Sequence, residues 1–231
     1  MIIAIIPARG GSKRIPNKNR INFCGKPLVA WTIEQTIKSK KVDEVYVSTE
    51  DEKIKRIALK FDAKVVDRPK DLARDHSTAE DVLKHAINEI AKKNPDKKIE
   101  LVVFLQPTSI LRETRDIDNA IETIIKRDAD SLFSAGLLKD FYIWKKNNEG
   151  NLISLNYDYK KRGRGQEFGN QYVENGSIYV FRPEILFKTN NRLCGKIAVS
   201  LMDFWKSFEI DEPEDLKFCK DIFKLKGLDK K

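Results

Sequence analysis

Short apolar runs alternate with helical periods over the first 130 residues. Residues 2–6 form an unbroken apolar run that ends at Pro7, a pattern typical of a strand buried on both faces of a sheet. Residues 45–48 and 101–105 repeat this pattern, and residues 64–66 are a shorter example. Apolar residues recur at spacings of three and four over the helical stretches 54–61, 79–90 and 117–125. This alternation predicts an α/β fold with a doubly wound, mainly parallel sheet and right-handed crossovers.

Two sequence signals predict where helices begin. Ser77 followed by Glu80 has the spacing of a capping box and predicts a helix that opens near residue 79. Pro213 suits the first turn of a last helix, because that position leaves an amide hydrogen unbonded anyway. One face of this helix is apolar: Leu216, Cys219, Ile222 and Phe223.

The pattern changes after about residue 135. Segments there are shorter, richer in aromatic residues and interrupted by polar ones, as at 141–144 and 177–181. We interpret this half as antiparallel or irregular additions to the sheet. No repeat or linker divides the 231 residues, so we expect a single domain over residues 1–231, with an arm at 137–176 that is able to pack on another subunit.

Composition and charge narrow the class of protein. Hydrophobic residues make up 41% of the chain, enough for a buried core, which excludes a disordered or fibrous chain. No apolar run approaches the roughly 18 residues of a spanning helix, so we expect a cytoplasmic protein without a membrane partner. The net charge is +9, and six basic residues without an acidic one lie between positions 9 and 26. Such an excess favours an anionic partner: a nucleotide, an acidic sugar or a nucleic acid.

The loop after the first strand has the composition of a polyphosphate site. Ligands of open parallel sheets bind beyond the carboxyl ends of the strands, where this loop lies. Gly10 and Gly11 let the backbone approach an anion, and Arg9, Lys13 and Lys18 can neutralise several phosphate charges. Neither Gly-x-x-x-x-Gly-Lys-Ser/Thr nor Gly-x-Gly-x-x-Gly is present. A solvated basic loop or a nucleic-acid patch is the alternative, but the position after a buried strand favours phosphate.

Four motifs in this chain resemble those of the acylneuraminate cytidylyltransferases, the CMP-sialic acid synthetases. They are IPARGGSKRIPNKN (6–19), LQPTSILR (105–112), ENGSIY (174–179) and IDEPEDL (210–216). The resemblance implies a fold of the nucleotide-diphospho-sugar transferase type, Mg²⁺ as cofactor and a homodimer. It also implies transfer of a cytidylyl group from CTP to a 2-keto acid sugar, with release of pyrophosphate. Related enzymes use sialic, legionaminic or pseudaminic acid as that sugar, so the resemblance does not select one.

The resemblance places the nucleotide on the first loop. The matching positions are Arg9, Gly10, Gly11, Ser12, Lys13, Lys18 and Asn19. Lys18 is expected against the phosphates, where a fixed cation stabilises the charge that develops on the leaving pyrophosphate. We take Lys18, Arg9 and Asp211 as candidate catalytic residues for an in-line attack on the α-phosphate without a covalent intermediate. The expected proton acceptor is a metal-bound water or Asp211 acting through one.

The resemblance also implies a sugar site. Gln106 follows the third buried strand, so its amide is expected in the same crevice, with Thr108 shaping the loop. Asn175 and Gly176 match the family's Asn-Gly pair, which is also the strongest signal of a hairpin turn. The predicted substrate-binding residues are Gln106, Thr108, Arg164, Gln166, Asn175, Gly176 and Tyr179.

This chain departs from the family at two positions near that sugar site. Val173 and Gly165 stand where the family often has arginine. The sugar carboxylate therefore falls to Arg162 or Arg164, or the substrate differs from sialic acid itself. Tyr179 either lines an apolar wall for an N-acyl group or belongs to the core.

Glu209 and Asp211 are the candidate metal ligands. Alternate positions on a strand place two side chains on one face, and carboxylate oxygens suit Mg²⁺. The family usually has two aspartates here, so Glu209 is a departure. The alternative for Asp211 is to cap the last helix, with Glu214 completing a capping box.

Two other functions remain open from the sequence. A sugar-1-phosphate nucleotidyltransferase would use the same sheet and basic loop, with a phosphate in place of the hydroxyl as the attacking group. A basic nucleic-acid-binding module without catalysis would use residues 9–26, although no reading helix or aromatic RNA-binding strand is recognisable.

Overall fold

The computed structural model describes residues 1–74, 76–138, 141–161 and 169–230. Within these residues, seven strands form one sheet in the order β11-β7-β10-β6-β1-β4-β5. The four apolar runs of the first half are parallel neighbours in it: β1 (Ile2–Pro7), β4 (Glu44–Thr49), β5 (Lys64–Asp67) and β6 (Leu101–Leu105). β1 lies between β4 and β6, which explains why its central residues are apolar without alternation.

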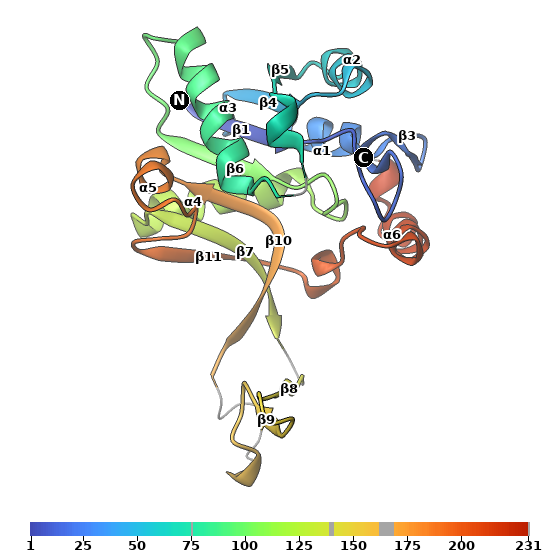
Figure 1. The fold of residues 1–231 in the computed structure, drawn as a ribbon, viewed down its shortest axis with the longest axis vertical. Helices are drawn as coiled ribbons and strands as arrows, with labels where there is room; N and C mark the ends of the chain where they lie inside the picture. The colour runs from blue at the N-terminus through green and yellow to red at the C-terminus, as the bar shows by residue number, and fades with distance from the viewer. Residues whose placement is uncertain (75, 139–140, 162–168, 231) are drawn as a thin grey trace.

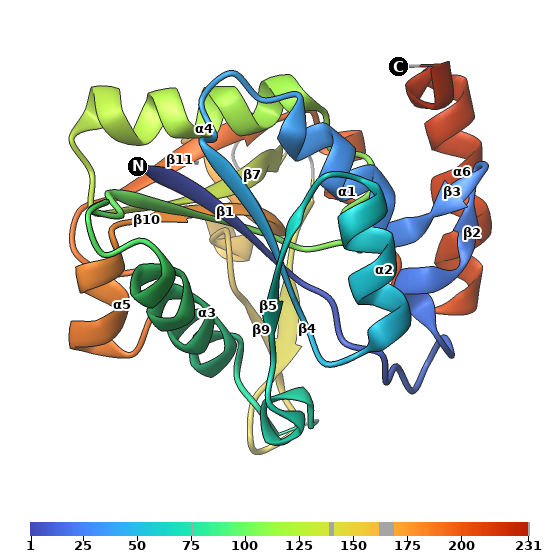
Figure 2. The same ribbon diagram turned by 90° about the horizontal axis from the view of Figure 1, so that it is seen from above.

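Helices cover both faces of this sheet (Figure 2). One core cluster packs the sheet against α1 (Leu28–Ile37), α2 (Glu52–Lys60) and α4 (Thr114–Arg127). The other packs it against α3 (Ala79–Lys93) and α5 (Pro183–Thr189). The predicted doubly wound α/β architecture is confirmed.

The second half adds three strands with mixed directions. β10 (Gln171–Phe181) runs antiparallel between β6 and β7 (Ser131–Leu138), while β11 (Ile197–Met202) is parallel to β7. The expectation of antiparallel or irregular additions is therefore right for β10 and wrong for β11, while β7 begins before the change of pattern near residue 135. Helix α4 forms the crossover from β6 to β7, which run in the same direction, whereas α5 connects β10 to β11, which run in opposite directions.

The Asn-Gly pair does not form a hairpin turn. Asn175 and Gly176 lie inside β10, where the register with β7 shifts between Glu174 and Tyr179. Gly176 has a φ of +66°, a conformation that glycine adopts without steric cost. The pair is thus a bulge, and the strand continues through it because both of its ends are paired with β7.

An arm extends from the sheet where β7 and β10 leave it (Figure 1). Its far end carries the hairpin of β8 (Trp144–Lys146) and β9 (Leu152–Ser154). The rings of Tyr157 and Tyr159 pack against Trp144 there, and Trp144 and Tyr159 remain largely exposed.

Both predicted capping boxes are displaced by one residue. Thr78 and Asp81 cap α3, whereas Ser77 donates its hydroxyl to the carbonyl of Asp71. Glu212 and Asp215 likewise cap α6 (Pro213–Leu225), so the alternative cap of Asp211 with Glu214 is wrong. Pro213 occupies the first helical position, as expected, which leaves the cap to the residue directly before it.

Short elements complete the described chain: η1 (Lys18–Arg20), β2 (Asn22–Phe23), β3 (Lys26–Pro27), η2 (Lys70–Ala73), η3 (Tyr159–Lys161), η5 (Phe204–Ser207) and η6 (Leu228–Lys230). No helix among the described residues has the length and apolar character needed to cross a membrane.

Candidate active site

A cleft of about 340 Å³ lies at the carboxyl ends of the central strands. Most of the predicted loop residues meet there with the residues that follow β6: Arg9, Ser12, Lys18, Asn19, Gln106 and Thr108. An adjoining hollow shares Arg9 and Ser12 with this cleft and is also lined by Gly11 and Lys13. The structure therefore brings all the nucleotide-loop candidates except Gly10, and two sugar-site candidates, to one place.

The two glycines of the loop have different roles. A Cβ on Gly10 would lie 2.5 Å from Oδ2 of Asp51, so only glycine fits against the end of β4 without a shift. The Gly10 amide donates to Oε1 of Glu50 at 2.7 Å, so a carboxylate of the protein itself already engages it. Gly11 has no atom within 4 Å of such a Cβ and remains open toward the hollow.

Asn19 holds the first loop in place through a hydrogen bond to its backbone. Its side-chain amide donates to the carbonyl of Arg9 at 2.9 Å, and the residue is buried. Asn17, two residues earlier, turns the chain with a φ of +58°, a conformation that asparagine tolerates better than most residues. The turn leads into η1, which begins at Lys18.

Lys18 joins the loop to the candidate metal ligands. Its Nζ donates to Oδ1 of Asp211 at 2.9 Å and to the carbonyl of Ile210 at 2.8 Å. The Lys18 side chain is 14% exposed, so a phosphate in the cleft would meet a cation that is already partly desolvated. This contact unites two motifs that lie 193 positions apart in the sequence.

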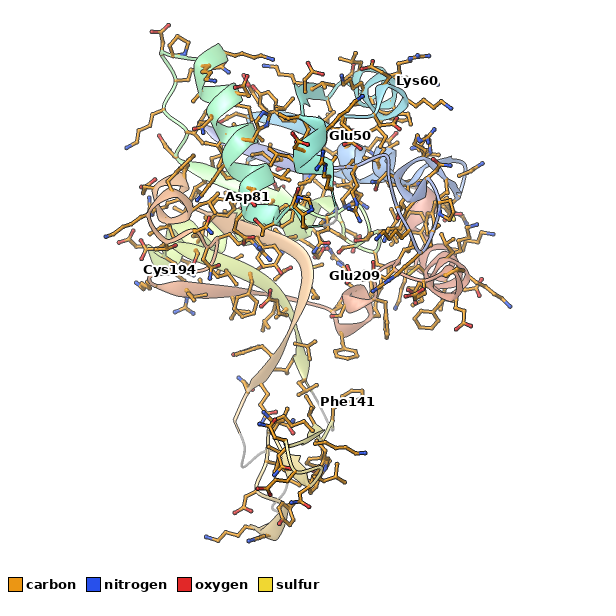
Figure 3. The ribbon with its side chains drawn as sticks, viewed as in Figure 1. Glu50, Lys60, Asp81, Phe141, Cys194 and Glu209 are labelled. Atoms are coloured by element: carbon orange, nitrogen blue, oxygen red, sulfur yellow. The ribbon has the colours of Figure 1, made fainter. Side chains whose placement is uncertain are left out.

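Glu209 and Asp211 lie on the segment that leads to α6, not on a strand; Glu209 is labelled in Figure 3. Ile210 between them is fully buried, and its amide donates to the carbonyl of Thr108 at 3.1 Å. Burial, and then the charge of Asp211, raise the pKa of Glu209. The two carboxylates are therefore neighbours, as predicted, although a loop and not a strand places them.

The donor set fits a hard divalent cation. Glu209 is partly desolvated, beside a second carboxylate, and accepts a hydrogen bond from Thr108 at 3.2 Å. No cluster of three or more histidine, cysteine, aspartate or glutamate residues occurs in the described part of the chain. Mg²⁺ is commonly coordinated by one or two carboxylates, with water and phosphate oxygens at the other positions.

The bulge of β10 forms a wall beside these carboxylates. A Cβ on Gly176 would lie 3.0 Å from Nε2 of Gln106 and 3.8 Å from Oε2 of Glu209. The Asn175 side chain is instead engaged within the sheet, where its Oδ1 accepts from the Ser134 hydroxyl at 2.6 Å. Of the Asn-Gly pair, Gly176 thus adjoins the site and Asn175 holds the bulge in shape.

Tyr179 lies next to the cleft wall. Its ring stacks on Phe104, which lines the cleft, and its hydroxyl donates to Glu174 at 2.5 Å. Burial, and then the hydrogen bond to Glu174, raise the pKa of Tyr179 to about 12. Arg162, Arg164 and Gln166, the other sugar-site candidates, lie outside the described residues.

Two arginines of the cleft were missed by sequence reasoning. Arg68 and Arg74 both line it, and Arg74 also lines the adjoining hollow. Arg68 is 7% exposed and donates from Nη2 to the carbonyl of Ser48 at 2.5 Å. Burial lowers the pKa of Arg68 to about 10, so it stays cationic at neutral pH. The sequence does contain a signal for Arg68: it directly follows β5, and the carboxyl ends of parallel strands share one edge of the sheet.

The fold and the cleft define an α/β nucleotidyltransferase: a cationic loop and a carboxylate pair face each other at the carboxyl edge of a mainly parallel sheet. The chain belongs to the cytidylyltransferase family, because the sequence model of that family matches residues 3–229. The alternative of a binding module without catalysis is therefore wrong.

Known relatives cover nearly all of the chain. Pseudaminic acid cytidylyltransferase of Campylobacter jejuni is 31% identical over 235 residues, 96% of each chain. CMP-N,N'-diacetyllegionaminic acid synthase of Legionella pneumophila is 32% identical over 231 residues, 97% of each chain. N-acylneuraminate cytidylyltransferase of Escherichia coli is 29% identical over 99% of this chain and 54% of its own length.

Solved structures share the fold at lower identity. A CMP:2-keto-3-deoxy-manno-octonic acid synthetase in complex with CTP has a TM-score of 0.68 at 17% identity, covering 97% of this chain and 99% of its own. The 4-diphosphocytidyl-2C-methyl-D-erythritol synthase of Anaerococcus prevotii has a TM-score of 0.67 at 14% identity, covering 96% of each.

Proposed function

We propose that this protein transfers CMP from CTP to a nonulosonic acid, a nine-carbon 2-keto acid sugar, and releases pyrophosphate. The observation that carries the proposal is the contact of Asp211 with Lys18, which lines the cleft together with Arg9 and Gln106. It places a phosphate-binding cation beside a carboxylate pair, next to the loop that follows β6. The relatives named above, which act on pseudaminic, legionaminic and N-acylneuraminic acids, support the sugar class.

In this function the protein positions the reactants and neutralises charge. Arg9 and Lys18 bind the triphosphate, so that the sugar hydroxyl attacks the α-phosphate in line with the leaving pyrophosphate. Lys18 stabilises the charge that develops on this leaving group. Asp211 lies beside Lys18 and accepts the proton of the hydroxyl through a water. No nucleophilic side chain takes part.

Mg²⁺ is the proposed cofactor, held by Asp211 and Glu209. When bound, it would supply additional positive charge to the phosphate oxygens. The raised pKa of Glu209 supports this assignment, because burial beside a like charge favours a cation between the two carboxylates.

We further propose a homodimer formed through the arm. Phe141, Trp144, Leu152 and Tyr159 lie on the arm with large exposed fractions (Figure 3 labels Phe141). The nearby rings of Phe204 and Phe208 continue this apolar surface toward the sheet. Apolar patches of this kind on a protein surface are typical of interfaces.

Pyrophosphate release is the direct test. The protein is incubated with CTP, Mg²⁺ and one acceptor at a time: pseudaminic acid, diacetyllegionaminic acid, N-acetylneuraminic acid and a sugar 1-phosphate. We expect pyrophosphate with at least one nonulosonic acid and none with the sugar 1-phosphate. GTP, UTP and ATP replace CTP in parallel and should give less product. Pyrophosphate with the sugar 1-phosphate alone would overturn the proposal in favour of a sugar-1-phosphate nucleotidyltransferase.

A further inference from the structure

Lys206 is a fully buried cation outside the cleft. It lies in η5 and is 1% exposed. Its Nζ is 2.7 Å from Oδ2 of Asp116 and 2.7 Å from Oε2 of Glu113. Both carboxylates belong to the start of α4, where Glu113 and Asp116 form the capping box. Neither Lys206 nor these carboxylates line the cleft.

This ion cluster fixes one end of the segment that carries the carboxylate pair. Lys206 precedes Glu209 by three residues. On the other side of Glu209, the amide of Ile210 donates to the carbonyl of Thr108 at 3.1 Å. Glu209 therefore lies between an anchor to α4 and a hydrogen bond to the loop after β6.

The start of α4 also holds the opposite wall of the site. Arg112 is fully buried and donates from Nη1 to the carbonyl of Ser177 at 2.8 Å. Its Nη2 is 3.4 Å from the carbonyl of Gln106. Residues 112–116 thus attach to the loop of Gln106, to the bulge of β10 and, through Lys206, to the segment of Glu209.

Stability alone does not require such a cluster. Removing charges from water is costly, and apolar side chains of similar size often stabilise a core equally well. An ion pair with fixed partners instead specifies where a segment lies. We propose that Lys206 is a positioning residue, which holds Glu209 and Asp211 at the separation and orientation that bind the divalent cation of the reaction. This inference rests on the proposed function and deepens it.

Metal binding without substrate tests the inference. Mn²⁺ binding to Lys206→Met is measured by electron paramagnetic resonance in the absence of nucleotide and sugar, with Mg²⁺ as competitor. We expect the Mn²⁺ dissociation constant to rise at least tenfold relative to the parent. Lys206→Arg, which retains the charge, should recover a large part of this loss. Glu113→Gln is a milder change that should raise the Mn²⁺ dissociation constant about threefold. It provides the test if Lys206→Met fails to fold.

A matched control separates positioning from general stability. Ile90 is fully buried in α3, away from the cleft, so Ile90→Ala should lower the melting temperature while Mn²⁺ affinity stays within twofold of the parent. If Lys206→Met keeps its Mn²⁺ affinity within twofold, or if Ile90→Ala loses as much, the inference is overturned.

Turnover provides a second readout. In Lys206→Met, kcat should fall at least tenfold while KM for CTP changes less than threefold, because the first loop is untouched. A parent enzyme without turnover on any nonulosonic acid would contradict the proposed function. The role of Lys206 would then be decided by the Mn²⁺ dissociation constants alone. Turnover in the parent with unchanged kcat in Lys206→Met would contradict the positioning role alone.

Discussion

Lys18 shows how a single side chain connects the two halves of the site. In the structure it bonds Asp211 and the carbonyl of Ile210, and its side chain is mostly buried. A phosphate group would therefore compete with Asp211 for a cation that is already partly desolvated. Charge that is preorganised in this way stabilises a transition state more strongly than it stabilises the bound substrate.

Replacing Lys18 by alanine tests this role. We expect Lys18→Ala to lose about 2–4 kcal/mol of transition-state stabilisation, which corresponds to a roughly 30- to 900-fold lower kcat. Pyrophosphate release under saturating CTP and sugar provides the measurement. Lys60, an exposed lysine of α2 labelled in Figure 3, supplies the control, and Lys60→Ala should retain parental kcat. A Lys18→Ala enzyme within twofold of the parent would exclude the role.

Elements of the fold are delimited by caps, as the start of α3 illustrates. Thr78 accepts a hydrogen bond from the amide of Asp81 at 3.1 Å, and Asp81 accepts from the amide of Thr78 at 3.3 Å. The neighbouring Ser77 hydroxyl donates to Asp71 and takes no part in the cap. Two adjacent hydroxyl residues therefore contribute differently to the same helix.

Stability measurements on these two residues should differ. Thr78→Ala should destabilise the protein by about 1 kcal/mol, and the melting temperature should fall by about 2–4 °C for a chain of this length. Ser77→Ala should cost less, about 0.5 kcal/mol, because the half-buried Ser77 loses one hydrogen bond to the Asp71 carbonyl and no cap. Thermal unfolding followed by circular dichroism provides both values. A larger loss for Ser77→Ala than for Thr78→Ala would contradict the observed cap.

Sequence periodicity was sufficient for elements whose signal is local. Buried strands and amphipathic helices repeat over a few residues, so β1, β6 and α4 were predictable. The caps were missed by one position because 77/80 and 78/81 both have a hydroxyl residue followed three positions later by an acid. The same ambiguity affected the last helix, since Asp211 and Glu212 are each followed three positions later by an acid and either could be its N-cap.

Contacts between distant segments were beyond such reasoning. Arg112 bonds Ser177, and Lys206 bonds Asp116, over separations of 65 and 90 residues. No local pattern marks either residue as buried, and lysine and arginine are among the residue types most often exposed. The first loop and the acidic pair were recognised because their residues are close together in the sequence.

At the scale of the molecule, the arm is attached to the sheet through a pair of facing residues. Leu138 and Gln171 are opposite each other in the β7–β10 ladder, so the chain leaves and re-enters the sheet at one place. A two-residue turn has the length that joins such a pair. The core of the fold therefore does not depend on residues 139–170 for closure.

Replacing residues 139–170 by Asn-Gly should give a folded protein that no longer dimerises. Light scattering after size exclusion should show the mass of a monomer, against a dimer for the parent, because the exposed aromatic side chains of the arm are removed. Leu225→Ser changes a residue on α6 that is 83% exposed and lies outside the arm, and it should leave the mass of the dimer unchanged. A truncated chain that retains the mass of the parent would place the interface elsewhere.

The contact of Lys18 with Asp211 also has a consequence for biosynthesis. Its two residues are 193 positions apart, so a nascent chain can build the first strands long before Asp211 leaves the ribosome. Long-range contacts of this kind form late, since the intervening chain must be ordered first. The site is therefore completed only when translation approaches α6, and any product that stops before residue 209 retains the basic loop but lacks both Glu209 and Asp211.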